Sequence, residues 1–291
     1  MKPPPFVYHA PTTVAEAVTL LDETGEEGQV LAGGQSLIPL MNFRLARPGH
    51  LVDVTSIRDL DYVRREDGRL RIGAATRQAA VERDPAAAEQ APLLVEALGF
   101  VGHEPIRHRG TVVGSLAHAD PAAEIPAVAL AMDAELTAVG ARGERRLAAS
   151  ELFTGPFSTS LEPGELLTEA QFTAWPPGSG HAFLEFARRH GDFAVAGAAV
   201  LLHLDGGVVD RAAIALCGVA GTPVRATEAE RRLLGERPTP AVVEAAAEAA
   251  TAGLTPVSDV HGSSAYRRQV ARAYVRRALA LAAERAQGGT R

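Results

Sequence analysis

At 291 residues, the chain exceeds the usual size of a single hydrophobic core, so two domains are expected. Hydrophobic residues make up 46% and charged residues 22% of the chain, which is typical of an ordinary soluble globular protein. Its net charge of −6 provides no positive field for nucleic acid or an anionic membrane, so both are disfavoured as partners.

The single cysteine, Cys217, excludes a disulfide within the chain and argues against an iron–sulfur cluster or a thiolate zinc site. It lies in the apolar run at 213–217, which predicts an inert, buried thiol. No run approaches the roughly 18 uncharged apolar residues that cross a membrane, and the start of the chain lacks the apolar core of a signal peptide. We therefore expect a cytoplasmic location.

The first 55 residues are predicted to form a compact unit in which strands and helices alternate. Thr12 or Thr13 is expected to cap the first helix, with Glu16 completing a capping box. The expected elements are strands at 6–9, 29–32 and 50–54 and helices at 12–24 and 36–43.

Residues 56–174 combine hairpins with short helices. The Asp-Gly pair at 67–68 predicts a hairpin turn, and Thr76 is a plausible helix N-cap. Pro105 prevents the regular helix that a zinc motif built on His103 and His108 would need, so no metal site is expected. The expected elements are hairpins at 61–73 and 133–147, helices at 76–82, 85–98 and 122–132, loops at 102–110 and 152–159, and a strand at 166–172.

The Pro- and Gly-rich stretch at 175–180 is the clearest linker and marks the expected domain boundary. Strands are predicted beyond it at 181–188, 194–204 and 208–218, followed by helices at about 226–234, 239–252 and 263–286. Strands first and helices afterwards indicate an antiparallel sheet with helices on one face. Core packing is expected to explain the stripe formed by Tyr266, Val270, Tyr274 and Arg277 on the last helix.

Two glycine-containing stretches, at 31–40 and 111–121, stand out as candidate phosphate-binding loops. In the first, Gly33 and Gly34 follow an apolar strand and precede a helix, so backbone amides can converge on an anion that side chains would otherwise keep away. A lone Gly-Gly pair is most often an ordinary turn, but two such loops could hold two linked phosphates. No lysine is required, and the only one is Lys2; the Rossmann fingerprint G-x-G-x-x-G is missing.

The same stretches carry a family resemblance. The segments AGGQSLIPLMNFRLARP at 32–48, IRHRGTVVGSLAHADPAAEIPAVALAMDAEL at 106–136 and RRHGDFAVAG at 188–197 resemble the FAD-binding medium subunit of molybdenum hydroxylases, of the carbon monoxide dehydrogenase type, with xanthine dehydrogenase flavoprotein segments as more distant relatives. The resemblance implies an α+β fold: a two-part FAD domain of the vanillyl-alcohol-oxidase (PCMH) type at 1–177, with subdomains at about 1–55 and 56–177, and a smaller C-terminal α+β domain at 178–291.

The resemblance also implies which residues bind the cofactor. Asp120 and Glu124 would bind ribityl or ribose hydroxyls, although Asp120 could instead be an N-cap and Glu124 a partner of the helix dipole. Leu166 or Leu167 and Phe193 would lie near the isoalloxazine ring, although Phe193 could equally be plain core. The FAD phosphates would be contacted by Ala32, Gly33, Gly34, Gln35, Ser36 and Leu37 in the first loop and by Thr111, Gly114 and Ser115 in the second.

Two positions depart from the family pattern. Val113 replaces the first glycine of the usual second loop, which a Cβ permits only at negative φ, so Val113 itself is in doubt as a ligand. Gln35 stands where many relatives have histidine, which matters little if the contact is made by the backbone.

The resulting hypothesis is an FAD-carrying electron-transfer subunit without catalytic acid–base residues. Its implied partners are a molybdopterin-containing large subunit and an iron–sulfur small subunit, assembled as a dimer of heterotrimers, with a quinone or NAD as acceptor. One alternative is a self-sufficient flavin oxidase or dehydrogenase, for which His181, His190 and His203 are the candidate bases. Another is a non-catalytic nucleotide-binding assembly module. A hydrolase is disfavoured because no G-x-S-x-G elbow is present.

Overall fold

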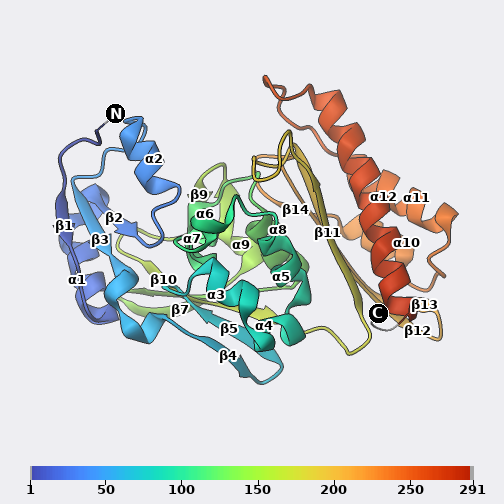
Figure 1. The fold of residues 1–291 in the computed structure, drawn as a ribbon, viewed down its shortest axis with the longest axis horizontal. Helices are drawn as coiled ribbons and strands as arrows, with labels where there is room; N and C mark the ends of the chain where they lie inside the picture. Colours follow the sequence, from blue (N-terminus) through green and yellow to red (C-terminus); the bar gives the residue numbers. More distant parts are fainter. Residues whose placement is uncertain (1, 289–291) are drawn as a thin grey trace.

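The computed structural model describes residues 2–288 and opens with a small parallel sheet. The sheet has the strand order β1-β3-β2 and is formed by β1 (Val7–His9), β2 (Gly28–Leu31) and β3 (His50–Asp53). The helices α1 (Val14–Thr24) and α2 (Leu37–Asn42) connect these strands (Figure 1). The prediction that Thr13 caps the first helix is confirmed, since Thr13 Oγ1 accepts from the Glu16 amide at 3.2 Å. The reciprocal bond of a capping box is shifted by one residue, because the Glu16 carboxylate accepts from the Thr12 amide, at 2.8 Å, rather than from the amide of the N-cap.

A five-stranded antiparallel sheet follows, with the order β4-β5-β10-β6-β7. Its strands are β4 (Val63–Glu66), β5 (Arg69–Gly73), β10 (Leu166–Thr173), β6 (Glu135–Gly140) and β7 (Gly143–Ala148). The helices of this part are α3 (Gln78–Arg83), α4 (Pro85–Gln90), α5 (Pro92–Leu98), α6 (Glu104–Arg107), α7 (Val112–His118), α8 (Glu124–Ala131) and α9 (Ala149–Leu152). A two-stranded hairpin joins β8 (Phe153–Gly155) to β9 (Ser158–Thr159).

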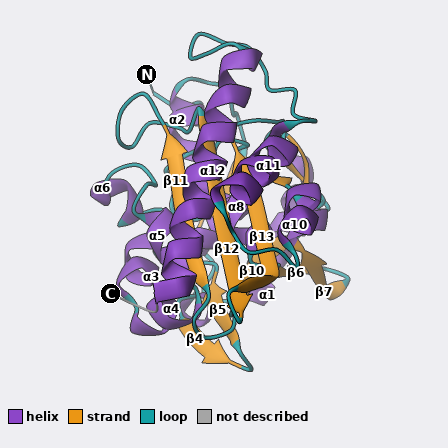
Figure 2. Ribbon diagram, turned by 90° about the vertical axis from the view of Figure 1, so that its right-hand side faces the viewer, coloured by secondary structure: helices purple, strands orange, loops and turns teal. Residues whose placement is uncertain are grey.

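The C-terminal part contains a four-stranded antiparallel sheet covered by helices (Figure 2). Its strands, in spatial order, are β11 (Gly180–Phe186), β12 (Ala196–Asp205), β13 (Val208–Cys217) and β14 (Val224–Arg225). The helices are α10 (Thr227–Leu233), α11 (Pro240–Thr251) and α12 (Ser264–Gly288). The antiparallel sheet expected from the order of elements is therefore confirmed.

Both faces of this sheet are buried. Along β12, alternate residues such as Ala198 and Val200 join the core formed with α10 to α12, whereas Ala199 and Leu201 join the larger core shared with the preceding sheet and helices. Helices α5 and α8 pack on this second face. The sheet thus joins the two parts of the molecule.

Several local predictions are wrong. Arg77, not Thr76, is the N-cap of α3, because the Thr76 hydroxyl exchanges hydrogen bonds with the Tyr62 backbone instead. The helix predicted at 85–98 is interrupted at Pro92, which cannot donate the amide needed to continue it. The stretch at 102–110 contains α6, since Pro105 lies in the first turn, where its missing amide costs nothing.

The predictions of a loop at 152–159 and of the apolar stripe on the last helix are also wrong. The loop contains the β8–β9 hairpin. Tyr266 of the stripe is 42% exposed, and the buried face of α12 is formed by residues such as Ala271, Val275 and Leu279. Tyr266 and Tyr274 instead lie beside Phe186 of the edge strand β11. Their ring centroids are 6.3 and 6.2 Å, respectively, from that of Phe186.

Candidate functional site

A polar groove of about 450 Å³ lies where the first glycine loop meets the helical part of the molecule. One wall is the end of β2 and the start of α2, and Asp53 and Thr55 contribute from the end of β3. Arg77 and Arg109 line the groove from the segments that flank α3 and α7. The remaining lining residues are Leu31, Ala32, Gly33, Gly34, Gln35, Ile38, Pro39 and Asn42.

The first glycine loop presents unused backbone donors. Gly34 has a φ of +71°, a left-handed conformation that glycine adopts without the cost of a Cβ. Within residues 2–288, none of the amides from Gly33 to Ser36 donates a hydrogen bond to the protein. Ser36 has no side-chain capping bond, so its hydroxyl is also free of this role. Four successive unpaired amides are the donor set that suits an anion.

Gly33 brings this loop against the segment that leads into α7. A Cβ at Gly33 would lie 2.6 Å from Gly110 Cα and 2.9 Å from the carbonyl carbon of Arg109, so only glycine fits here. The two predicted phosphate-binding stretches are also close at Gly114, where a Cβ would lie 3.7 Å from Ala32 Cβ. The structure therefore brings together two stretches that lie about 80 residues apart in the sequence.

The second stretch forms the helix α7, so the prediction of a glycine loop there is wrong. Thr111 is the N-cap of α7, and its hydroxyl accepts from the Gly114 amide at 3.0 Å. The Ser115 amide bonds to the Thr111 carbonyl at 3.2 Å. Neither amide is therefore available to a phosphate, although the Ser115 hydroxyl is. The first-turn amides of α7, those of Val112 and Val113, are the ones that a helix leaves without an internal partner.

The sequence did not predict that two cationic side chains, those of Arg77 and Arg109, would line the groove. The Arg77 guanidinium donates to the Arg109 carbonyl, the same carbonyl group that packs against Gly33. Within the described part of the chain, the Arg109 guanidinium has no ion-pair or hydrogen-bond partner. Arg77 lies outside the segments that carry the family resemblance, and Arg109 lies within the one at 106–136. No local pattern connects either side chain to the first loop, so the fold identifies them as residues of the groove.

Asp120 lies between α7 and α8, Glu124 begins α8, and both side chains are buried. The Asp120 carboxylate accepts from the Ala122 amide at 2.9 Å, and the N-cap of α8 is Ala123, so Asp120 is not a helix cap. Glu124 is the first residue of α8 and is 6% exposed. Burial, followed by the neighbouring Asp120 charge, raises the pKa of Glu124 to about 7.

The residues expected near a flavin ring lie on different elements. Leu166 and Leu167 begin the central strand β10 and are buried, each 3% exposed. Phe193 lies in the loop between β11 and β12 and is 67% exposed, so the alternative that it is plain core is wrong. An exposed phenyl ring in a loop is free to contact a ligand or a partner chain.

The three candidate bases, His181, His190 and His203, do not lie together. His181 and His203 lie at one end of the β11–β12 pair, whereas His190 lies in the loop at the other end. His108 bonds to Glu104 and His103 lies beside His190. Across residues 2–288, no group of three or more potential ligands could hold a metal ion. No helix in the same range has the length and apolar character needed to cross a membrane.

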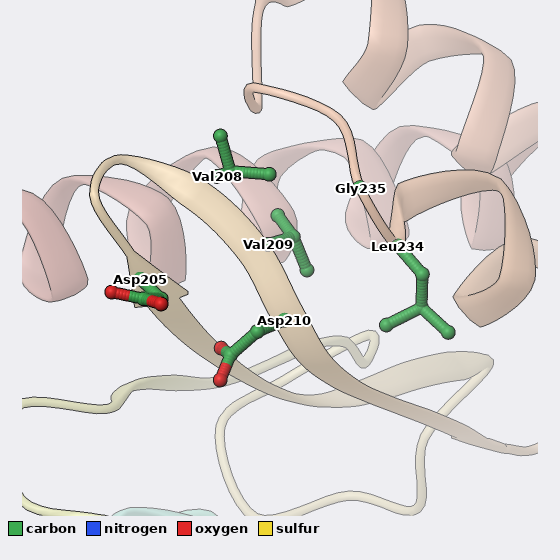
Figure 3. Close-up of a pocket in the computed structure, with 6 residues that line it drawn as sticks. All are labelled: Asp205, Val208, Val209, Asp210, Leu234 and Gly235. Carbon is green, nitrogen blue, oxygen red and sulfur yellow. The ribbon is translucent and has the colours of Figure 1, made fainter.

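A second hollow, of about 360 Å³, lies at the hairpin between β12 and β13 (Figure 3). Its lining is largely apolar, with Val208, Val209 and Leu234, and its charged residues are Asp205 and Asp210. The Asp210 carboxylate accepts from His203 Nδ1 at 2.7 Å. Carboxylates repel phosphate, so the groove beside the first glycine loop is the better candidate for an anionic ligand.

Comparison with known proteins identifies relatives along the whole chain. The FAD binding domain in molybdopterin dehydrogenase matches residues 4–173, and the CO dehydrogenase flavoprotein C-terminal domain matches residues 181–282. The chain is 46% identical to the 6-hydroxypseudooxynicotine dehydrogenase complex subunit alpha of Paenarthrobacter nicotinovorans, over 99% of this chain and 97% of that protein. It is 39% identical to the carbon monoxide dehydrogenase medium chain of Hydrogenophaga pseudoflava, over 96% and 97% of the two chains.

Solved structures of known proteins also superpose closely on this chain. Carbon monoxide dehydrogenase from Hydrogenophaga pseudoflava has a chain that superposes with a TM-score of 0.96 at 40% identity, covering 98% of this chain and 99% of that one. A chain of quinoline 2-oxidoreductase from Pseudomonas putida 86 superposes with a TM-score of 0.94 at 37% identity, covering 98% and 99%.

Proposed function

Because this chain belongs to the family of FAD-binding medium subunits of molybdenum hydroxylases, we propose that it carries electrons from iron–sulfur clusters of a partner subunit, through FAD, to a quinone or NAD-type acceptor. FAD is the cofactor of the chain. When bound, the flavin supplies the redox chemistry, and the protein has to hold and orient it.

The groove beside the first glycine loop is the observation that carries the proposal, because its donors fit a dinucleotide diphosphate. Of the four residues with unpaired amides, Gly33, Gly34 and Gln35 line the groove, and Ser36 follows directly. Arg77 and Arg109 line the same groove. Each hydrogen bond to a charged oxygen contributes on the order of 1.5–3 kcal/mol, so several converging donors can hold a diphosphate without a lysine. In this assignment, Arg109 contacts the diphosphate and Arg77 positions Arg109 through its backbone carbonyl.

The remaining cofactor contacts complete the assignment. The Ser115 hydroxyl and Thr111 border the diphosphate from α7, and Asp120 and Glu124 bind hydroxyl groups of the sugar or ribityl chain. Leu166, Leu167 and Phe193 face the isoalloxazine ring. Ala32, Gln35 and Leu37 contribute from the first loop and the start of α2. The FAD domain covers residues 1–177, with subdomains at about 1–55 and 56–177, and the C-terminal domain covers 178–291.

The chain's own composition requires partner subunits for the complete reaction. A single cysteine cannot ligate an iron–sulfur cluster, so the electron donor has to be another chain. The relatives are named as subunits or chains of larger enzymes, such as the nicotine 6-hydroxylase medium subunit and the carbon monoxide dehydrogenase medium chain. We assign a molybdopterin-containing large subunit and an iron–sulfur small subunit as the partners, in a dimer of heterotrimers.

The test is purification of the full-length tagged chain from its native host together with whatever copurifies. We expect about one FAD per chain after acid extraction, molybdenum and iron in the same complex, and reoxidation of the reduced flavin by a quinone or by NAD. A complex that contains FAD but no iron would contradict the proposed electron donor. A complex without FAD would contradict the assignment of the groove.

A further inference from the structure

The start of α3 bonds to three successive carbonyl groups in one wall of the groove. The Arg77 guanidinium donates to the Arg109 carbonyl. The Gln78 backbone amide donates to the Gly110 carbonyl at 2.8 Å, and the Gln78 side chain donates through Nε2 to the Thr111 carbonyl at 3.3 Å. Arg77 and Thr111 also form an isolated antiparallel bridge. This wall is therefore attached to the start of α3 at each of its three residues.

The Gln78 side chain also packs directly on the backbone of the wall. Gln78 is 4% exposed. A Cβ at Gly110 would lie 2.7 Å from Gln78 Oε1, 3.0 Å from its Cδ and 3.3 Å from its Nε2, and these are the three nearest atoms. A Cβ at Gly33, in the first glycine loop, would in turn lie 2.6 Å from Gly110 Cα. Because Gly110 contacts both, the position of the Gln78 side chain determines how closely the wall approaches the loop.

One atom of this side chain lacks a hydrogen-bond partner, which argues against a purely structural role. Gln78 Oε1 is buried and accepts from no group within residues 2–288. A buried, unpaired acceptor destabilises a fold, whereas an apolar side chain of the same length carries no such cost. The Thr111 carbonyl would still accept from the Ser115 amide without Gln78. Stability alone would therefore favour methionine here, and what glutamine adds is the Nε2 donor to Thr111, the N-cap of α7.

We propose that Gln78 is a positioning residue of the FAD site. Its side-chain amide fixes the wall at 109–111 in the place where Arg109 and the first glycine loop can hold one anion together. Gln78 does not itself line the groove, so it acts through the backbone of Gly110 and Thr111. This role rests on the proposed function, because it requires the cofactor diphosphate to bind in the groove.

The first test replaces Gln78 by methionine, which keeps the length of the side chain and removes both the donor and the unpaired acceptor. The complex is purified through the tagged full-length chain, its flavin is removed, and FAD is titrated back by fluorescence. We expect Gln78→Met to bind FAD about three- to tenfold more weakly than the parent, because one hydrogen bond that holds the wall is lost. The urea midpoint of the FAD-free chain should equal or exceed that of the parent, since no buried acceptor is left unpaired.

The matched control is Gln90→Met. Gln90 is also buried, 7% exposed, but it ends α4, and no hydrogen bond found within residues 2–288 connects its side chain to the wall. FAD affinity should be unchanged in this variant. Equal FAD affinity in Gln78→Met and the parent would overturn the proposal, and a lower urea midpoint in that case would make Gln78 a purely structural residue.

The second test asks whether Gln78 and the wall act as one unit. Gly110→Ala places a methyl group against the Gln78 amide and should displace it from Thr111, so we expect FAD binding to weaken about three- to tenfold. In a Gln78→Ala background the atoms that the methyl group meets are gone, and Gly110→Ala should cause little further loss of affinity. Losses that simply add in the double variant would overturn the proposal. This comparison also decides the matter should Gln78→Met fail to fold.

Failure of this role is distinguishable from failure of the proposed function. A parent complex that takes up no FAD would overturn the proposed function, and the role of Gln78 with it. A parent that binds FAD, together with equal affinities in Gln78→Met and Gln90→Met, would leave the proposed function standing and remove only Gln78 from the site.

Discussion

Replacement of Gly33 by alanine is the sharpest test of the groove, because the added methyl group meets only backbone. Its Cβ would lie 2.6 Å from Gly110 Cα and 2.9 Å from the carbonyl carbon of Arg109, whereas real Cβ contacts are longer than 3.0 Å. No flexible side chain can move aside, so the first loop has to separate from the segment at 109–110. Overpacking of this kind costs about 1–3 kcal/mol. The displaced loop also moves its amides away from the diphosphate, and loss of a hydrogen bond to a charged oxygen, about 1.5–3 kcal/mol, weakens FAD binding about ten- to hundredfold.

The matched control is Gly253→Ala, because nothing lies within 4 Å of a Cβ there and the backbone has no left-handed conformation. FAD affinity is measured by fluorescence titration and the free energy of unfolding by denaturant. We expect Gly33→Ala to lose affinity, and to lose about 1–3 kcal/mol of stability when unfolded without FAD, while the control loses neither. Equal FAD affinity in the two variants would refute the placement of the diphosphate beside Gly33.

Three further predictions concern the second wall of the groove and the interface behind it. Arg109→Ala should weaken FAD binding about ten- to hundredfold, because it removes a charged donor from the groove. The control Arg83→Ala breaks an exposed ion pair with Glu104 and should leave FAD affinity unchanged. Equal FAD affinities of the two variants would contradict the role of Arg109. Because folding partly buries Glu185 and so raises the pKa of its carboxyl, the free energy of unfolding of the parent chain should decline as pH rises from about 4.5 to 8. Urea unfolding should show Glu185→Gln to be more stable than the parent by roughly 1–3 kcal/mol at pH 8 and no more stable at pH 5. Phe183→Ala should destabilise the chain by about 3–5 kcal/mol, since this fully buried ring packs against Phe100 between the sheet and α5; a smaller loss in calorimetry would mean that the interface contributes little to stability.

Features that depend on neighbouring residues were accessible from the sequence. The N-cap Thr13 and its partner Glu16 are recognisable within four residues, and their side chains accept from the amides of Glu16 and Thr12. The alternating strands of the C-terminal sheet and its turn at Asp205–Gly207 follow from side-chain period and glycine conformation in the same way. Such features need no knowledge of what packs against them.

Predictions failed where a distant or competing partner decides the local structure. Thr76 has the chemistry of a cap, but the Tyr62 backbone, 14 residues away, takes its hydroxyl. Thr111, in contrast, does act as a cap: its hydroxyl accepts from the Gly114 amide at the start of α7, so the stretch expected to be a glycine loop is a helix. In both cases a threonine had two plausible partners, and the sequence alone does not rank them.

The groove itself is the clearest case of a site created by packing between distant segments. The glycine turn was recognisable because conformational freedom is a property of the residue, but its second wall is formed by Arg109, whose carbonyl is held by Arg77 and whose backbone contacts Gly33. The backbone at 109–110 thus accepts a hydrogen bond from Arg77 and packs against Gly33. Loss of Arg77 should therefore act on the groove through the position of Arg109 rather than through charge alone. We therefore expect Arg77→Lys, which keeps the charge but lacks the planar guanidinium, to have the same low FAD affinity as Arg77→Ala. We expect Arg109→Lys, in contrast, to bind FAD more tightly than Arg109→Ala. A lysine that restores FAD affinity at position 77 but not at position 109 would mean that Arg77 contacts the anion directly.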